Sequence, residues 1–374
     1  MKQEARTLAK HHPKNERMKR KYLAWLEEAR RRNPATADQA AAAIALFEKS
    51  TGWKDFATFR IEQAIKFKRD LNAALHEKTG KPLQKATIRS RLLDVKAFFL
   101  WLADQQGYRS AIRYADCEYF NPSANDARVA TARRERPVPT LDQIRHVIAN
   151  APHTTAIEQR DRALIAWTLL TGMRDSAIAS LPIGKVDLER REVDQDARVV
   201  KTKNSKTMTT FFFPVGDDVE AVVAEWIAYL KTELHFGDSD PLFPQTEVTL
   251  NADGEFSASG LKREFWTSAT AIRRIFRERF EAAGLPYFHP HSFRKTLAQL
   301  AYRLKLDLES AKAWSQNLGH EKPITTWTSY GKIDDSRTSE ILSRLATRET
   351  PSEPTVSLTE LEALVERLRK TRDA

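Results

Sequence analysis

The stretch RDRALIAWTLLTGMRDSAIASL, residues 160–181, decides how the second half of the chain folds. Its middle, Ala163–Leu170, is the longest apolar run of the chain and is far too short to span a bilayer. The pattern around it predicts a helix over Glu158–Thr171, and Gly172 predicts a turn at the end of that helix. The turn would present Arg174, two residues after Gly172, as an accessible side chain.

A polar stretch upstream separates two domains. SANDARVATARRERPVP, residues 123–139, lacks apolar periodicity and is rich in Arg, Ala and Pro, which indicates a linker. Thr140 and Gln143 then form a capping-box signature, so the second domain begins at about Pro139. A chain of 374 residues is too long for one ordinary core. We expect five parts: a basic N-terminal extension (1–32), a helical domain (33–122), a linker (123–136), a second domain (137–345) and a C-terminal helix (346–374).

The first domain is predicted to be all helical and the second to be mixed. The apolar patterns predict helices near residues 38–49, 61–78, 87–105, 141–149, 158–171, 218–234, 267–283, 292–304, 308–318 and 358–370. The segment Arg198–Pro214 is rich in β-branched and aromatic residues around Asn204-Ser205, which predicts a hairpin. The predicted fold class is therefore mainly α with a small β-sheet, an all-helical domain being followed by a mixed α/β domain.

The charge of the chain favours a polyanionic partner. Its formal net charge is +11, which attracts nucleic acid first and an anionic membrane second. The first 32 residues carry 11 Lys/Arg against 4 Asp/Glu, and they are either a DNA-contacting arm or a solvated basic helix. In the predicted helix 87–105, Arg89 and Arg91 lie opposite the apolar stripe, on a face that could line DNA.

The single cysteine, Cys117, excludes an intramolecular disulfide framework and a cysteine-rich zinc site. This cysteine usage fits a reducing cytoplasm. The first 20 residues are too polar for a signal peptide, so we expect a cytoplasmic protein with no membrane partner.

Four segments contain the candidate catalytic residues. They are TGMRDSAIASL at 171–181, the lysine-rich hairpin, HPHSFRK at 289–295 and NLGHEKPITTWTSYG at 317–331. The order is Arg174, a hairpin lysine, His291-x-x-Arg294, His320 and Tyr330. In this order the chain resembles the tyrosine recombinase (phage-type integrase) family from about residue 160 to residue 331. The helical first half resembles the core-binding domain of that family, with weaker motifs.

The same residues suit phosphodiester cleavage by a protein hydroxyl. That reaction needs a nucleophile, neutralisation of the charge on a pentacoordinate phosphorane and a proton for the departing 5′ oxygen. Arg174 and Arg294 suit the second task, because a guanidinium is always charged and offers a planar fork to phosphate oxygens. His291 and Arg294 are three residues apart and share one helix face. His289 and His291 have no carboxylate or cysteine at ligand spacing, so we expect no metal site.

The resemblance implies a role for each remaining residue. Tyr330 would be the nucleophile, and His320 would hydrogen-bond the scissile phosphate. The general acid would be a lysine, and the family's Lys-Thr-x-x-x-(Lys/Arg) string matches Lys201 with Lys206. Lys203 is the alternative acid, since strand alternation places Lys201 and Lys203 on one face and does not choose between them.

The lysines that do not act as the acid could contact phosphate. Two features depart from the family pattern. Ala177 stands where the family often has Glu, and the spacing from His320 to Tyr330 is one residue longer than is common.

The resemblance also implies a covalent 3′-phosphotyrosyl intermediate, no cofactor, and two domains that close around double-stranded DNA. Synapsis would need a homotetramer, to which the predicted C-terminal helix could contribute by packing onto a neighbouring subunit, although packing onto its own domain is an equal alternative. Two other functions remain open. One is relaxation of DNA in the manner of a type IB topoisomerase, and the other is DNA binding without cleavage, which only Ala177 favours.

Overall fold

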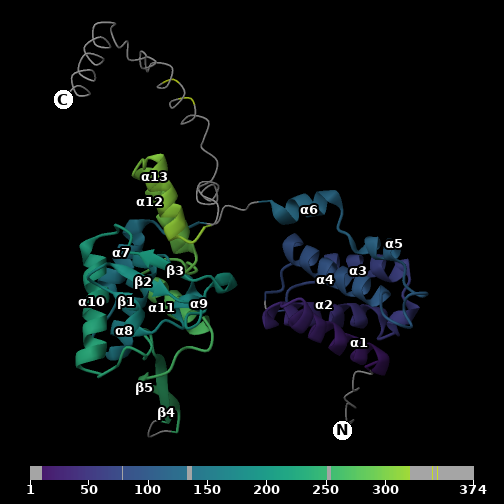
Figure 1. The fold of residues 1–374 in the computed structure, drawn as a ribbon, viewed down its shortest axis with the longest axis horizontal. Coiled ribbons are helices and arrows are strands. Elements are labelled where there is room, and N and C mark those ends of the chain that lie inside the picture. Colours follow the sequence, from purple (N-terminus) through teal and green to yellow (C-terminus); the bar gives the residue numbers. More distant parts are fainter. Residues whose placement is uncertain are drawn as a thin grey trace, which may run out of the picture. The chain divides into compact units, whose positions relative to one another are not determined.

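The computed structural model describes residues 11–77, 79–132, 137–250 and 254–320, together with Ser339 and Ser343. The chain divides into two compact units, residues 1–134 and 135–374 (Figure 1). We call them the N-terminal unit and the C-terminal unit. None of the helices within these described ranges is long and apolar enough to cross a membrane.

The N-terminal unit is helical throughout its described part, as predicted. Its α-helices are α1 (Pro13–Ala24), α2 (Pro34–Thr51), α3 (Ile61–Ala73), α4 (Lys85–Ala103), α5 (Tyr114–Cys117) and α6 (Ala124–Thr131). Helix α2 begins where Asn33 accepts a hydrogen bond from the Ala35 amide and ends at Gly52, whose φ is +70°. The core is rich in phenylalanine: Phe47 and Phe99 pack edge to face at 5.0 Å between centroids.

Helix α1 belongs to the core of this unit, whereas the sequence placed residues 1–32 outside it. Met18 and Tyr22 are buried. The fully buried side chain of Asn15 donates to Glu48 Oε1 at 3.0 Å, and Lys19 lies 2.6 Å from Glu48 Oε2. Because these polar contacts are made inside the unit, α1 is part of its fold and not a free arm.

Half of the predicted linker is also helical. Ser123 accepts a hydrogen bond from the Asp126 amide at 3.0 Å and so caps α6, and Asp126 forms an ion pair with Lys85 of α4 at 2.8 Å. The sequence showed no apolar periodicity here because α6 has no buried residue. A linker therefore has to begin after Thr131.

The C-terminal unit surrounds one buried helix with other helices and a small sheet, which confirms the predicted fold class. Its elements are α7 (Leu141–Asn150), α8 (Ala156–Thr171), α9 (Asp175–Ile178), β1 (Val186–Asp187), β2 (Glu192–Gln195), β3 (Met208–Phe211), α10 (Asp217–Thr232), β4 (Gln245–Leu250), β5 (Phe256–Lys262), α11 (Thr270–Ala282), α12 (Ser292–Arg303) and α13 (Leu308–Asn317). Every residue of α8 from Ala163 to Thr171 is buried. Helices α7, α10, α11 and α12 all contact it.

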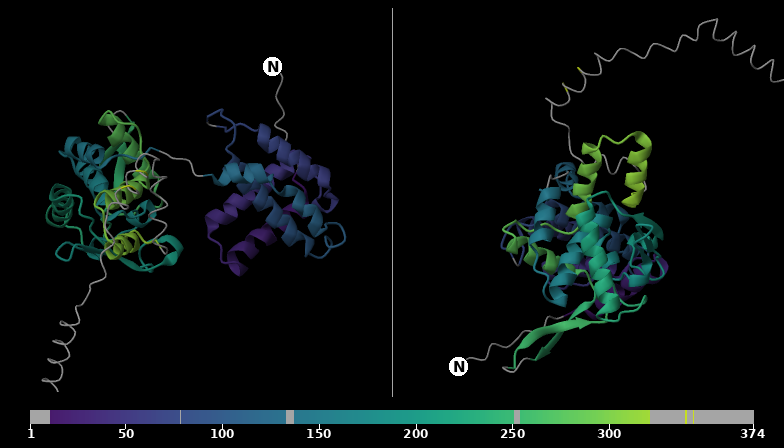
Figure 2. Two further views of the ribbon diagram at one scale, coloured as in Figure 1. Left: turned by 90° about the horizontal axis from the view of Figure 1, so that it is seen from above. Right: turned by 90° about the vertical axis from the view of Figure 1, so that its left-hand side faces the viewer.

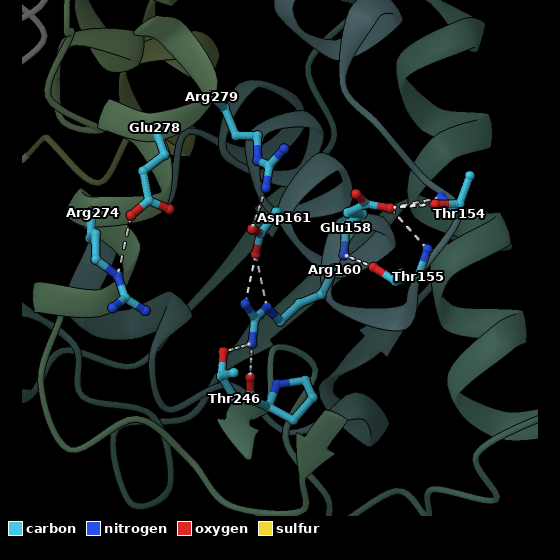
Figure 3. A network of polar contacts seen from close by, with 10 residues as sticks. Thr154, Thr155, Glu158, Arg160, Asp161, Thr246, Arg274, Glu278 and Arg279 are labelled. Atoms are coloured by element: carbon cyan, nitrogen blue, oxygen red, sulfur yellow. Dashed lines mark hydrogen bonds and ion pairs between the residues drawn. The ribbon is translucent and has the colours of Figure 1, made fainter. Parts of the chain in front are cut away.

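A buried polar network fixes α8 to two other parts of this unit (Figure 3). Arg160, only 1% exposed, donates to Asp161 through Nε and Nη2 and to Pro244 O and Thr246 Oγ1 through Nη1. Asp161 also accepts from Arg279 of α11 at 3.3 Å. The network thus joins α8 to α11 and to the start of β4.

The lysine-rich segment does not form the predicted hairpin. Strand β2 pairs with β3 in antiparallel register, Gln195 opposite Met208, so that residues 196–207 form the loop between them. Within this loop the Lys201 amide donates to Ser180 Oγ at 2.8 Å, and Val200 is buried. These tertiary contacts replace strand pairing, so the alternation expected for Lys201 and Lys203 does not apply.

A second hairpin, β4–β5, was not predicted at all. Its strands pair antiparallel with an irregularity between Glu247 and Val248, and most of its residues are exposed. It projects from the C-terminal unit as a two-stranded arm (Figure 2).

Candidate active site

The turn between α8 and α9 positions Arg174. Gly172 ends α8 with a φ of +58°, and a Cβ at this residue would lie 2.8 Å from Leu297 Cδ1. Glycine is therefore required both for the backbone conformation and for the close approach of α12. Arg174 follows in extended conformation and is half-buried at the start of α9.

Arg174 does not pair with the neighbouring acid. Asp175 instead binds Arg273 of α11, with the Arg273 Nη2 and Nε atoms 2.9 and 3.0 Å from Asp175 Oδ2. Among the described residues no carboxylate forms an ion pair with Arg174. Partial burial lowers the pKa of Arg174 below its ordinary value.

Arg294 is 6% exposed, and it holds the surrounding backbone in place. Its Nη1 donates to Gly172 O at 2.5 Å, and its Nη2 donates to Leu318 O and lies 3.2 Å from His320 Nε2. Its Nε is buried and has no hydrogen-bond partner in the described part of the chain. Burial, followed by the charge of Arg174, lowers the pKa of Arg294 to about 9. A buried cation with one unused donor is suited to an anion.

Two histidines lie within electrostatic reach of both arginines. Desolvation, then the charges of Arg294 and Arg174, lower the pKa of His291 and of His320 from 6.5 to about 4. His291 lies just before α12, where its amide donates to His289 Nδ1 at 3.1 Å. Both imidazoles are therefore neutral at pH 7, and each can donate one hydrogen bond.

A pocket of about 380 Å³ opens beside these groups. It lies between α9, the β2–β3 loop and the end of α13. Its lining residues are Arg174, Ala177, Gln195, Thr202, Lys203, Asn204, Lys206, Met208, Gly319 and His320. None of these described lining residues is acidic, so none of them neutralises the positive charge of Arg174.

The lysines of the loop differ in their positions. Lys203 and Lys206 line the pocket, and the charge of Lys203 contributes to the lowered pKa of His320. The Lys201 side chain is exposed and does not line the pocket. Its backbone amide donates a hydrogen bond to Ser180 Oγ.

Of the other predicted residues, Arg294 and His291 are near this pocket but are not among its described lining residues, and the rest lie elsewhere or outside the described residues. Tyr330 lies outside the described residues, as does the predicted helix 358–370. Arg89 and Arg91 lie half-buried on α4 of the N-terminal unit, and their contact with DNA stays a prediction. Within the described ranges there is no group of three or more His, Cys, Asp or Glu side chains that could hold a metal ion.

Some lining residues escaped the sequence reasoning. Gln195 and Met208 face each other at the ends of β2 and β3, and neither belongs to a motif. Gly319 adopts a φ of +66°, and a Cβ there would lie 3.0 Å from Met208 Sδ. The only signal for Gly319 was its place in the Leu-Gly-His turn.

Comparison with known proteins agrees with this geometry. The chain matches the model of the Phage integrase family over residues 139–337. Tyrosine recombinase XerC of Lactobacillus leichmannii is 26% identical over 314 residues, which are 83% of this chain and 92% of that protein. Tyrosine recombinase XerC of Corynebacterium glutamicum is 24% identical over 246 residues, 65% of this chain and 66% of that protein.

Two solved structures share the fold. The Tn1549 transposon integrase in complex with transposon right end DNA has a TM-score of 0.57 at 16% identity, covering 88% of this chain and 99% of that one. A lambda integrase dimer bound to a COC′ core site has a TM-score of 0.57 at 13% identity, covering 86% and 99%.

Proposed function

The chain belongs to the phage integrase family, and from this premise we propose that it recombines DNA at specific sites through a covalent 3′-phosphotyrosyl intermediate on Tyr330. Membership makes the chain an enzyme that cleaves and rejoins DNA strands. The steps and the residues that carry them are proposed below.

The observation that carries the proposal is the pairing of two arginines without acid partners. Arg174 and Arg294 each lower the pKa of both histidines, and within the described residues no carboxylate forms an ion pair with either arginine. A phosphate between them would supply the missing negative charge. By analogy with oxyanion donors, each arginine would stabilise the transition state by about 3 kcal/mol.

In the proposed first step the Tyr330 phenol releases its proton to water, and its oxygen attacks the phosphorus of the scissile bond. A tyrosyl phosphodiester forms, the bond to the 5′ oxygen breaks, and this oxygen takes a proton from a lysine. Arg174 and the unused Nε of Arg294 bind the non-bridging oxygens, while His291 and His320 donate hydrogen bonds to them. Attack by the 5′ hydroxyl of another strand reverses these steps and rejoins the DNA.

We assign the proton donor to Lys203. This lysine lines the pocket together with Arg174 and His320, whereas Lys201, which the family string favours, does not. Lys206 lines the same pocket and would contact phosphate.

The partner would be double-stranded DNA, since the Tn1549 and lambda integrases were both solved with DNA bound. We propose that the two units close around the duplex, that four copies assemble at synapsis, and that the chain serves a mobile element.

A pool of nicked duplexes with randomised sequence around the nick tests the proposal. Cleavage near the nick releases a short fragment, so rejoining fails and the enzyme stays covalently attached. We expect an adduct with the wild type, none with Tyr330→Phe, and undiminished adduct with Tyr302→Phe, a tyrosine of α12.

The outcomes separate the functions. An adduct that persists in Tyr330→Phe would show that another residue is the nucleophile. Binding of the pool with no adduct from the wild type would indicate a protein that binds DNA without cleaving it. Relaxation of supercoiled plasmid without paired sites would favour a type IB topoisomerase.

A further inference from the structure

The β4–β5 hairpin carries an apolar face that nothing in the described structure covers. Leu250 pairs with Phe256 and Val248 with Ala258, so these four residues share one face of the ribbon. Val248, Leu250 and Phe256 are 54%, 62% and 80% exposed. A lone two-stranded hairpin is marginally stable in water, and a contiguous apolar face on it indicates a binding surface.

The hairpin is fixed firmly at its base. Arg160 Nη1 donates to Pro244 O at 3.0 Å and to Thr246 Oγ1 at 2.9 Å, on the β4 side (Figure 3). The guanidinium also lies over the Trp266 ring, which follows β5, at 5.5 Å. A rigid base reduces the conformational entropy that the arm would lose on binding.

The charge of the arm disfavours DNA as its partner. Residues 245–261 contain the acids Glu247, Asp253 and Glu255 and no lysine or arginine, in a chain whose net charge is +11. The last residue of β5, Lys262, is ion-paired with Glu264 at the base. Phosphates would repel such a segment. The arm instead suits a surface that is apolar at its centre and basic at its edge.

The same unit has a pocket of that kind at the start of α12. It measures about 570 Å³, and its walls include Val138, Tyr287 and Phe288. His289 and Lys295 also line it, and Arg277 covers the Tyr287 ring at 4.3 Å. No acidic residue is among its lining residues. The pocket is large enough for the side chain of Phe256, the most exposed apolar residue of the hairpin.

An arm cannot reach the pocket of its own unit. The hairpin projects from the end of the unit that is remote from α12, in both views that show it clearly (Figures 1 and 2). We propose that the apolar face of β4–β5 in one copy of this chain docks into the α12 pocket of a second copy. Because the two surfaces differ, the contact is heterologous and would close copies into a ring or extend them into a chain.

The docked arm would lie against His291, which lines the pocket. Assembly would therefore restrict a residue of the candidate active site. The docking itself does not rest on DNA cleavage, and its test needs none.

Disulfide cross-linking between two full-length variants tests the contact. One chain carries Phe256→Cys and the other, enlarged by a tag, carries Val138→Cys. Both retain Cys117, which is buried. The two chains are mixed with plasmid DNA and oxidised mildly. The DNA binds a basic protein and so raises its local concentration. We expect a cross-linked heterodimer in at least tenfold greater yield than from the pair Ser257→Cys and Val138→Cys, since Ser257 lies on the opposite face of β5.

Equal yields from the two pairs would overturn the proposal, as would no cross-link in either. A cross-link from Val138→Cys to Leu361→Cys in place of Phe256→Cys would assign the pocket to the C-terminal segment and would also overturn it. Folding is not at risk, because Phe256 is 80% exposed.

Discussion

At the scale of single residues, the two arginines of the site differ in how they are held. Arg294 donates to the carbonyl oxygens of Gly172 and Leu318, so its position depends on the ends of α8 and α13. Arg174 follows the turn at Gly172, and its side chain makes no hydrogen bond or ion pair with another described residue. Burial, and after it the charge of Arg174, lowers the pKa of Arg294, so both the loss of solvent and the neighbouring cation make this charge unfavourable.

The two histidines should make the stability depend on pH. Their folded pKa of about 4 lies below the ordinary 6.5, so between these values the unfolded chain binds more protons. The free energy of unfolding should therefore be fully retained above pH 6.5 and fall as the pH is lowered towards 4. Urea unfolding at pH 7, 6 and 5 measures this slope.

The control is a double variant, His291→Asn with His320→Asn, whose slope should be shallower than that of the wild type. A variant outside the site, His146→Asn, should keep the wild-type slope. Parallel slopes for the wild type and the double variant would contradict the assignment.

The proton donor can be tested with a substrate whose leaving group needs less protonation. A 5′ sulfur leaves with less protonation than oxygen, so a substrate with sulfur at the scissile 5′ position should restore cleavage to Lys203→Ala. On the ordinary substrate that variant should lose about a hundredfold or more in the rate of adduct formation. Rescue of Lys201→Ala in its place would return the role to Lys201.

The order of the motifs along the chain named four residues that the structure places near one another, and their roles in catalysis stay predictions. The four are Arg174, Arg294, His291 and His320. Which lysine lines the pocket was not predictable, since the position of Lys201 depends on its amide reaching Ser180, which is 21 residues away in the sequence. No local pattern encodes that contact.

At the scale of elements, α8 is held by the buried carboxylate of Asp161. We expect Asp161→Ala to lower the free energy of unfolding by about 3–5 kcal/mol, because two arginines would lose their partner inside the unit. Urea unfolding measures it.

The matched control is Glu278→Ala, whose ion pair with Arg274 is exposed and 3.7 Å long. It should cost at most about 1 kcal/mol. Equal losses in the two variants would show that burial does not set the strength of the Asp161 contacts.

Elements with strong apolar periodicity were predictable, and those held by polar contacts were not. Helices α2, α4, α7, α8 and α10 to α13 lie within a few residues of their predicted ranges. The packing of α1 into the core was missed because its buried contacts include Asn15 and Lys19, which a sequence pattern assigns to solvent. The β4–β5 hairpin was missed because its base is fixed by Arg160, some 85 residues upstream.

At the scale of the whole molecule, the charge predicts how DNA binding responds to salt. Each phosphate that the protein neutralises should contribute about −0.9 to the log–log slope of affinity against salt concentration. Titration of a labelled duplex between 50 and 200 mM salt, roughly the range in which such slopes are measured, should give a steep decline.

The double variant Arg89→Ala with Arg91→Ala tests whether these two arginines contribute to the salt dependence. If both α4 arginines contact phosphate, the slope should become shallower by about 1.8. An unchanged slope would remove them from the DNA interface, and a flat response in the wild type would contradict a phosphate-binding surface altogether.

The unequal support of the two arginines also has a consequence for how copies of such a gene decay. In a copy that no longer recombines DNA, Arg294 would still stabilise the fold, because that side chain donates to the carbonyl oxygens of Gly172 and Leu318. Arg174 makes no comparable stabilising hydrogen bonds with the described residues. Substitutions of Arg174 would therefore accumulate before substitutions of Arg294. In a survey of degenerate relatives, a retained Arg294 would not indicate that the protein is active. The loss of Arg174 would indicate a gene copy whose product no longer recombines DNA.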